Sequence, residues 1–80
     1  MKIDVAEFIR GAAEVLDVDA RTLSLETPFR DSVPHWSSLL GYGLIVWMEE
    51  TYGFAWPVDA FEEAITLGDL FDIVGKHERP

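Results

Sequence analysis

Apolar residues near the start of the chain recur at intervals of three and four positions, which is the spacing along one face of an α-helix. The residues on this face are Val5, Phe8, Ile9, Ala12 and Leu16. Charged residues lie between them, Asp4 can cap the first turn, and residues 17–19 are suited to end the helix. A helix that is apolar along one face must bury that face, so the rest of the chain has to cover it.

The chain is 80 residues long, which limits it to one domain. A chain of this size buries only roughly 60% of its unfolded surface and has no material for a second core or a deep enzymatic cleft. Hydrophobic residues make up 49% of the sequence, well above the content of disordered chains, so a packed core is expected. We predict a single domain over residues 1–80 that folds alone and is not an enzyme.

The charge and the lack of cysteine narrow the possible partners. Six Lys and Arg residues stand against fifteen Asp and Glu residues, a formal net charge of -9. This field repels a phosphate backbone, which disfavours nucleic-acid binding, and it attracts partners with basic surfaces. Solubility alone is an equally good explanation of the acidic balance. Because the chain has no Cys, any thiol chemistry has to come from an attached group.

The sequence predicts neither a signal peptide nor a membrane span. The N-terminus has no long apolar run before its first acidic residues. The most apolar stretch, residues 39–48, is shorter than the about 20 residues that a membrane-spanning helix needs. We therefore expect a soluble, cytoplasmic protein without membrane insertion.

Residues 19–36 show no helical period and contain several turn-forming pairs, such as Thr27-Pro28 and Val33-Pro34. This pattern predicts a long ordered loop, and the side chains suited to anchor it are Leu23, Leu25 and Phe29. A loop of this length in a compact domain is more often functional than not. Its end delivers Trp36, Ser37 and Ser38 to the next element.

A second helix is predicted to begin at Ser37 or Ser38, whose hydroxyls can cap it, and to run to about Tyr52 before Gly53 ends it. Two glycines within it cost about 0.5–1 kcal/mol each, so tertiary packing must hold the helix. The face assigned to the core comprises Leu44, Ile45, Met48 and Tyr52. A second apolar face comprises Leu39, Tyr42 and Val46. This second face is either covered by the loop or exposed as a docking surface.

The last third of the chain predicts two more helices. Asp59 is suited to cap a short helix through Ala64, and Thr66 to cap a final helix that runs to about Val74 and ends at Gly75. The predicted fold is an all-α, monomeric four-helix bundle with three longer helices, one short helix and a long loop between the first and second helices.

No arrangement of residues supports catalysis or metal binding. Asp31, His35 and a serine could suggest a hydrolase triad, but there is no G-x-S-x-G motif and no oxyanion hole in the loop. His35 and His77 lack the spacing of metal ligands, and the paired glutamates lie on different sides of their helices. We predict no catalytic residue and no metal site, and interpret His35 as a loop histidine.

Ser38 is the sharpest feature of the sequence. A serine at the start of a helix projects into solvent near the positive end of the helix dipole, where the charge of a phosphodiester is favoured. The alternative is that this serine is only an N-cap.

The chain from Trp36 to Lys76 resembles the second half of an acyl carrier protein. The matching pieces, in order, are Ser38-Leu39, Met48-Glu49-Glu50-Thr51-Tyr52-Gly53, Trp56-Pro57 and Ile65-Thr66-Leu67-Gly68-Asp69. The first helix and the Thr27-Pro28-Phe29 loop also match, with about one additional loop residue before Ser38, so the resemblance covers nearly the whole chain.

This resemblance implies a phosphopantetheine arm on Ser38, transferred from coenzyme A by a phosphopantetheinyl transferase, with acyl groups carried on it as thioesters. The family's motif is Asp-Ser-Leu, and here it reads Ser37-Ser38-Leu39. The resemblance further implies presentation to fatty-acid, polyketide or related biosynthetic enzymes. The residues that it places in partner contacts are Leu39, Tyr42, Val46, Glu49 and Glu50.

The resemblance also implies that an acyl chain can be sheltered among the helices. The residues that would line such a cavity are Leu44, Ile45, Met48, Phe61, Leu67 and Phe71. The second helix is poorer in acids than is usual for the family, which predicts a more apolar docking face and a specialised set of partners. Two alternatives are an unmodified helical adaptor and, because residues 57–61 faintly resemble one, a D-alanyl or peptidyl carrier with amino-acid cargo.

Overall fold

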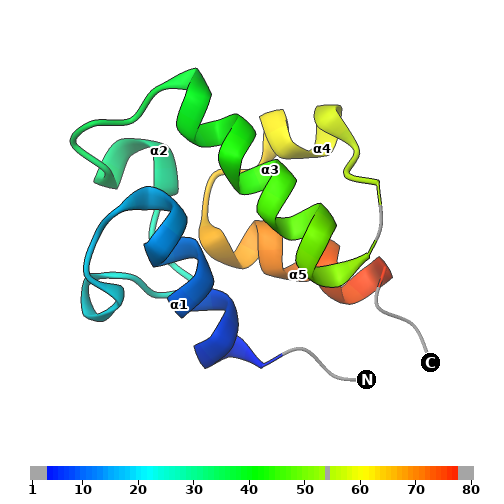
Figure 1. The fold of residues 1–80 in the computed structure, drawn as a ribbon, viewed down its shortest axis with the longest axis horizontal. Coiled ribbons are helices and arrows are strands. Elements are labelled where there is room, and N and C mark those ends of the chain that lie inside the picture. Colours follow the sequence, from blue (N-terminus) through cyan, green and yellow to red (C-terminus); the bar gives the residue numbers. More distant parts are fainter. Residues whose placement is uncertain (1–3, 54, 78–80) are drawn as a thin grey trace.

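The computed structural model describes residues 4–53 and 55–77, and these residues are mostly helical (Figure 1). They contain no β-strand, so the predicted all-α class is confirmed. One of the helices, η1, is a single 3₁₀ turn. The elements in chain order are α1 (Val5–Leu16), η1 (Ala20–Thr22), α2 (Phe29–Ser32), α3 (Ser38–Tyr52), α4 (Val58–Glu63) and α5 (Leu67–His77).

The first helix begins and ends where local chemistry predicts. The Asp4 side chain accepts a hydrogen bond from the Ala6 N–H at 2.8 Å, which caps α1. Asp17 then takes the left-handed conformation with φ 58° and ends the helix. Gly53 ends α3 in the same way, with φ 78° and its N–H donating to the Glu49 carbonyl at 2.9 Å.

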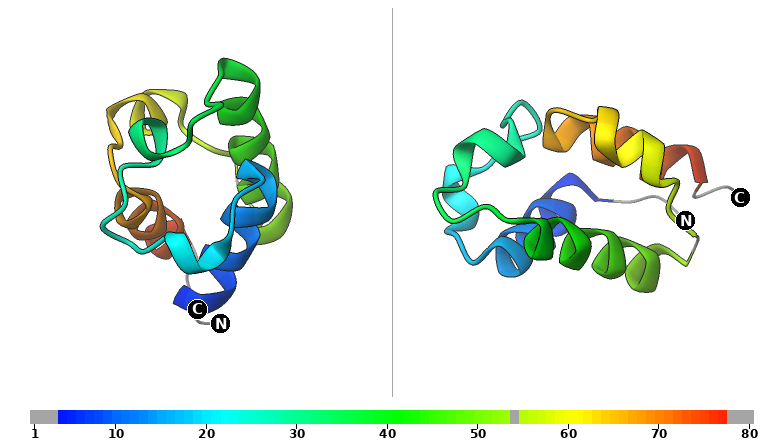
Figure 2. Two further views of the ribbon diagram at one scale, coloured as in Figure 1. Left: turned by 90° about the vertical axis from the view of Figure 1, so that its left-hand side faces the viewer. Right: turned by 90° about the horizontal axis from the view of Figure 1, so that it is seen from above.

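The helices surround one core. Helices α1 and α3 pack side by side, and α5 lies on the other side of the core (Figures 1 and 2). A Cβ atom at Gly11 would overlap the Trp47 ring, so this glycine lets the indole lie directly against α1. The largest completely buried side chains are Phe8, Leu16, Phe29, Leu44, Met48, Leu67, Leu70 and Val74. No described helix is both long and apolar enough to cross a membrane.

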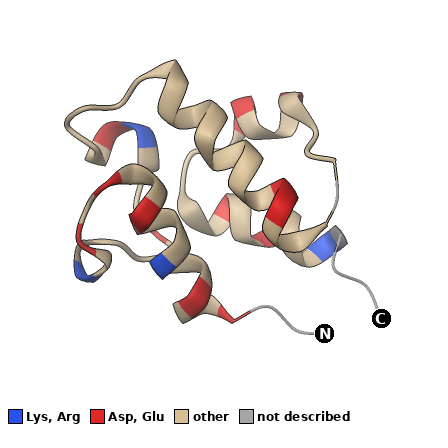
Figure 3. Cartoon of the chain, in the orientation of Figure 1, with Lys and Arg blue, Asp and Glu red and all other residues tan. Residues whose placement is uncertain are grey.

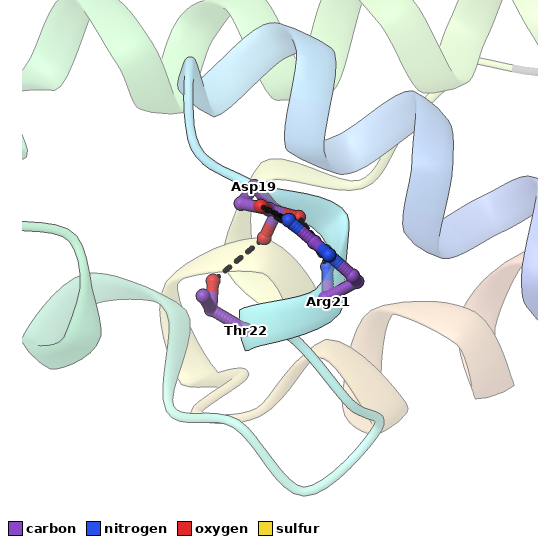
Figure 4. A network of polar contacts seen from close by, with 3 residues as sticks. All are labelled: Asp19, Arg21 and Thr22. Carbon is purple, nitrogen blue, oxygen red and sulfur yellow. Dashed lines mark hydrogen bonds and ion pairs between the residues drawn. The ribbon is translucent and has the colours of Figure 1, made fainter.

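The predicted loop between the first two long helices contains two short helices, η1 and α2, that were not predicted, so the described residues have more helices than the four expected. Asp19 caps η1 by accepting the Arg21 N–H at 2.9 Å, and the two side chains form an ion pair at 2.8 Å (Figure 4). The Arg21 side chain lowers the pKa of Asp19 below its usual value. Helix α2 is a single turn that buries Phe29 completely. Elements this short are held by one cap or one buried ring and leave no periodic pattern in the sequence.

Backbone hydrogen bonds tie this connection to the start of α5. The Phe29 N–H donates to the Ile65 carbonyl at 3.2 Å, and the Leu67 N–H donates to the Thr27 carbonyl at 3.0 Å. The Gly68 N–H donates to the Leu25 carbonyl at 2.7 Å. A Cβ atom at Gly68 would lie only 2.8 Å from that carbonyl oxygen, so glycine is required for this close approach. As predicted, Phe29 anchors the connection in the core, and Leu23 and Leu25 pack against it.

The last two helices differ from the prediction at their ends. Pro57, with φ -74°, is the N-cap of α4, and Asp59 lies inside the first turn, so the prediction that Asp59 caps this helix is wrong. The Thr66 cap of α5 is confirmed, because its hydroxyl accepts the Asp69 N–H at 3.2 Å. Helix α5 continues past Gly75 to His77. A single exposed glycine costs a helix only about 1 kcal/mol, which does not suffice to end it.

Candidate functional site

The two serines before α3 have different environments. Ser37 is the N-cap, in an extended conformation, and its hydroxyl accepts a hydrogen bond from the Leu40 N–H at 3.4 Å. Ser38 is the first residue of the helix, is exposed, and its hydroxyl makes no hydrogen bond to the described residues. Since Ser37 does the capping, the Ser38 hydroxyl is not needed to cap the helix.

The start of α3 is suited to hold an anion. The helix has 15 residues and no acidic residue in its first turn. The first N–H groups of a helix have no acceptor within it, and the helix dipole places partial positive charge there. The Ser37 carbonyl and hydroxyl take the N–H groups of Gly41 and Leu40, which leaves those of Ser38 and Leu39 without an intrahelical acceptor. A phosphodiester on the Ser38 oxygen would be stabilised by these groups.

The segment that leads to Ser37 is held against the end of α1. The His35 Nε2 atom lies 2.8 Å from the Leu16 carbonyl oxygen. A carbonyl oxygen can only accept, so Nε2 carries the proton and donates it. The Trp36 N–H donates to the Val33 carbonyl at 3.2 Å. His35 therefore fixes the loop, in agreement with its interpretation as a loop histidine.

The inner side of this site is a cluster of three aromatic rings, Phe29, Trp36 and Phe61, which we call the aromatic cluster. The centroid of the Phe29 ring lies 5.7 Å from the centroids of both other rings. A Cβ atom at Gly41 would lie 3.2 Å from Cζ2 of Trp36 and 3.5 Å from Cε2 of Phe61. Gly41 has a low helix propensity, but because it lacks a Cβ atom the Trp36 indole can pack closely against α3.

Arg30 covers the aromatic cluster and joins α2 to α4. Its Nη1 donates to the Ala64 carbonyl at 2.6 Å, and its Nη2 donates to the Phe61 carbonyl at 2.8 Å. Its Cζ lies 4.7 Å from the ring centroid of Phe29 and 5.2 Å from that of Phe61. Sequence reasoning missed Arg30, because its partners lie more than thirty positions away along the chain.

The apolar outer face of α3 is exposed at its N-terminal end. The exposed fraction is 78% for Leu39 and 65% for Tyr42, whereas Val46 is half-buried. Residues 38–48 include no charged residue, and Figure 3 shows this half of α3 without red or blue segments. Of the two readings of this face, coverage by the loop is thus wrong for Leu39 and Tyr42.

The two glutamates predicted to contact partners have different environments. Glu50 is exposed near the C-terminal end of α3. Glu49 is half-buried, and its Oε2 accepts the Trp56 N–H at 2.8 Å, so it helps to hold the segment between α3 and α4. Glu50 is therefore available at the surface, while Glu49 also has a structural role.

The residues that the resemblance assigns to a cavity belong to the core. Leu44, Met48 and Leu67 are completely buried, and Phe61 is 6% exposed. Ile45 and Phe71 are partly buried and pack against these side chains. Over the described ranges there is no group of three His, Asp or Glu residues that could hold a metal ion.

No protein-family model matches the sequence, and no curated protein is significantly similar to it.

Proposed function

We propose that this chain is a carrier protein that bears phosphopantetheine on Ser38. The observation that supports this most is that the two serines have different roles. Ser37 caps α3, whereas Ser38 is exposed with a free hydroxyl at the positive end of the helix. A serine needed only as a cap would not require a second serine beside it. The resemblance of the surrounding motifs to acyl carrier proteins agrees with this assignment.

The residues of α3 fit the proposed group. The backbone N–H groups of Ser38 and Leu39 would bind its phosphate, and the absence of acids from the first turn avoids repulsion. When bound, phosphopantetheine supplies the thiol that this Cys-free chain lacks, and that thiol holds acyl groups as thioesters. The protein itself provides the attachment point and the surface that its enzymes recognise.

The proposal extends to the fold and to the cellular context. We propose that α1, α3, α4 and α5 form a carrier-like bundle, with η1 and α2 inside the connection between its first two helices. The carrier would act as a monomer in the cytoplasm, where coenzyme A is available for loading. Its partners would be a phosphopantetheinyl transferase and the acyl-transferring, condensing or acyl-activating enzymes of fatty-acid, polyketide or related biosynthesis.

The surface beside Ser38 favours specialised partners. Leu39 and Tyr42 are exposed next to the attachment point, and the nearest acids of α3, Glu49 and Glu50, lie about three turns from Ser38. We propose that Leu39, Tyr42, Val46 and Glu50 contact the partners mainly through apolar burial. Binding should then weaken much less with salt than charge-dominated association does.

The test is the intact mass after incubation with coenzyme A and several phosphopantetheinyl transferases, followed by peptide mapping. We expect a single phosphopantetheine on Ser38. Ser38→Ala should abolish the mass increase and keep the helical circular-dichroism spectrum, because the capping hydroxyl belongs to Ser37. The matched variant Ser37→Asp restores the family's motif and keeps a good N-cap, so it should load at least as well as the wild type. An unmodified wild type and an unmodified Ser37→Asp variant, both folded, would refute the proposal.

An unmodified adaptor is the second candidate, and the exposure of Leu39 and Tyr42 favours it. An adaptor would bind its partner without phosphopantetheine, and Ser38→Ala would not affect that binding. A peptidyl or D-alanyl carrier would be modified on Ser38 like an acyl carrier. It would be recognised by charging of the modified protein by an adenylation enzyme rather than by malonyl or fatty-acyl donors.

A further inference from the structure

The inner side of the first turn of α3 is filled by the side chain of Trp36. Gly41 follows Ser38 by three residues, so the two lie one above the other along the helix, Ser38 exposed and Gly41 buried. The Trp36 Cζ2 atom and the Phe61 Cε2 atom would lie 3.2 and 3.5 Å from a Cβ atom at Gly41. The ring of Trp36 therefore lies against the buried side of the α3 backbone, one turn after Ser38.

Trp36 is held in this position from several elements. Its ring packs against that of Phe29 of α2 in a T-shaped arrangement, with 5.7 Å between centroids and 60° between planes. The Cζ atom of Arg30 lies 6.0 Å from the centroid of the Trp36 ring, and the same guanidinium donates hydrogen bonds to the carbonyls of Phe61 in α4 and of Ala64, the C-cap of α4. Moving the indole aside would break its contacts with the completely buried ring of Phe29 and with the guanidinium of Arg30.

We propose that Trp36 closes the bundle to the cargo, so that this protein carries acyl groups with little apolar surface, short or polar ones that stay outside the helices. This inference rests on the proposed attachment at Ser38. Each apolar methylene group gains free energy only if it leaves water. A carrier whose entrance is filled offers a long alkyl chain no such gain, whereas a short or polar acyl group loses nothing by staying in solvent.

The first test compares acyl groups on the wild type, Trp36→Ala and the control Trp47→Phe. Each protein is loaded with acetyl- or decanoyl-phosphopantetheine, and the rate of thioester cleavage by hydroxylamine is followed by mass spectrometry. In the wild type and in Trp47→Phe, both thioesters should be cleaved at the same rate. In Trp36→Ala the decanoyl form should be cleaved about tenfold more slowly, because burial of about two methylene groups suffices for that preference. The control ring packs on Gly11, on the α1 side of the bundle.

The second test needs no loading. In the unmodified Trp36→Ala protein, benzene should shift the methyl resonances of neighbouring core residues, because an apolar cavity of this kind takes up benzene. The wild type should show no shift. Trp36→Phe, which keeps the contact with Phe29, replaces the alanine variant if that variant does not fold.

The outcomes separate the two proposals. Absence of any modification on Ser38 overturns the carrier function, and benzene uptake then still decides whether Trp36 closes the bundle. Normal loading with a decanoyl thioester that is protected in the wild type overturns the inference and leaves the carrier function standing. Equal cleavage of both thioesters in a folded Trp36→Ala protein also overturns it, because Trp36 would then not be the group that keeps the chain out.

Discussion

Replacement of Arg30 by alanine tests the long-range contact that joins α2 to α4. The substitution removes two charged hydrogen bonds, to the Ala64 carbonyl at 2.6 Å and to the Phe61 carbonyl at 2.8 Å. It also removes the guanidinium from its place over Phe29, 4.7 Å from the ring centroid. No described residue offers a second charged donor to these two carbonyls.

The magnitude follows from these contacts. A hydrogen bond from a charged donor contributes about 1.5–3 kcal/mol, and an exposed cation–π contact about 0.5–1 kcal/mol. Arg30 is only half-buried, so in the variant water can form part of the hydrogen bonds that the guanidinium made to the two carbonyls. We expect a loss of about 2 kcal/mol in the free energy of unfolding. For a domain of this size that corresponds to a fall in Tm of roughly 10 °C.

The assay is thermal and urea unfolding followed by circular dichroism, with two comparison variants. Arg10→Ala makes the same change of charge at an exposed position of α1 and should change stability by less than about 0.5 kcal/mol. Arg30→Lys keeps the charge but not the planar guanidinium that reaches both carbonyls, so its loss of stability should lie between those of Arg10→Ala and Arg30→Ala. If Arg30→Ala is no less stable than Arg10→Ala, these hydrogen bonds do not contribute to the fold.

Two further predictions concern α5. Gly68→Ala should cost about 1–3 kcal/mol in chemical unfolding, because the new Cβ would lie 2.8 Å from the Leu25 carbonyl oxygen. At Gly75 a new Cβ would meet no atom within 4 Å apart from its chain neighbours and its own helix backbone, so Gly75→Ala should stabilise the same helix by about 0.5–1 kcal/mol. Equal effects of both changes would contradict the close approach at Gly68. A hydrogen bond from the Ile65 N–H is the main cause that lowers the pKa of the Asp69 carboxyl below its usual value. The charged carboxylate therefore stabilises the folded state above about pH 4, and this stabilisation is lost as the pH falls through the lowered pKa. Asp69→Ala removes the hydrogen bonds from the Ile65 and Thr66 N–H groups, and because Asp69 is exposed, water replaces part of them, so the variant should be about 1 kcal/mol less stable than the wild type at pH 7. The difference should shrink in unfolding curves measured below about pH 4, and a difference that grows on acidification would show the opposite sign of linkage.

The caps show how far sequence reasoning reaches in this fold. Asp4, Gly53 and Thr66 act where they were predicted to act, because each bonds to atoms only two to four residues away. The capping of α3 was predicted as well, but not which serine performs it. Both hydroxyls are chemically suitable, and only the conformation of Ser37, with φ -153° and ψ 167°, assigns the cap to it and leaves Ser38 free.

Spacing and local pattern by themselves determined the all-α class and the extent of α1 and α3, because these depend on neighbours along the chain. The choice of Ser38 as the candidate attachment residue rests on the resemblance of the sequence motifs to acyl carrier proteins. The tertiary structure decided the rest. It placed Arg30 on the end of α4, His35 on the end of α1 and Glu49 on the backbone of Trp56. The contacts of Arg30 and His35 join residues nineteen or more positions apart, and that of Glu49 crosses the break between two helices. Polar side chains like these can bind any accessible carbonyl or N–H, and only the packing of the helices determines which one lies within reach.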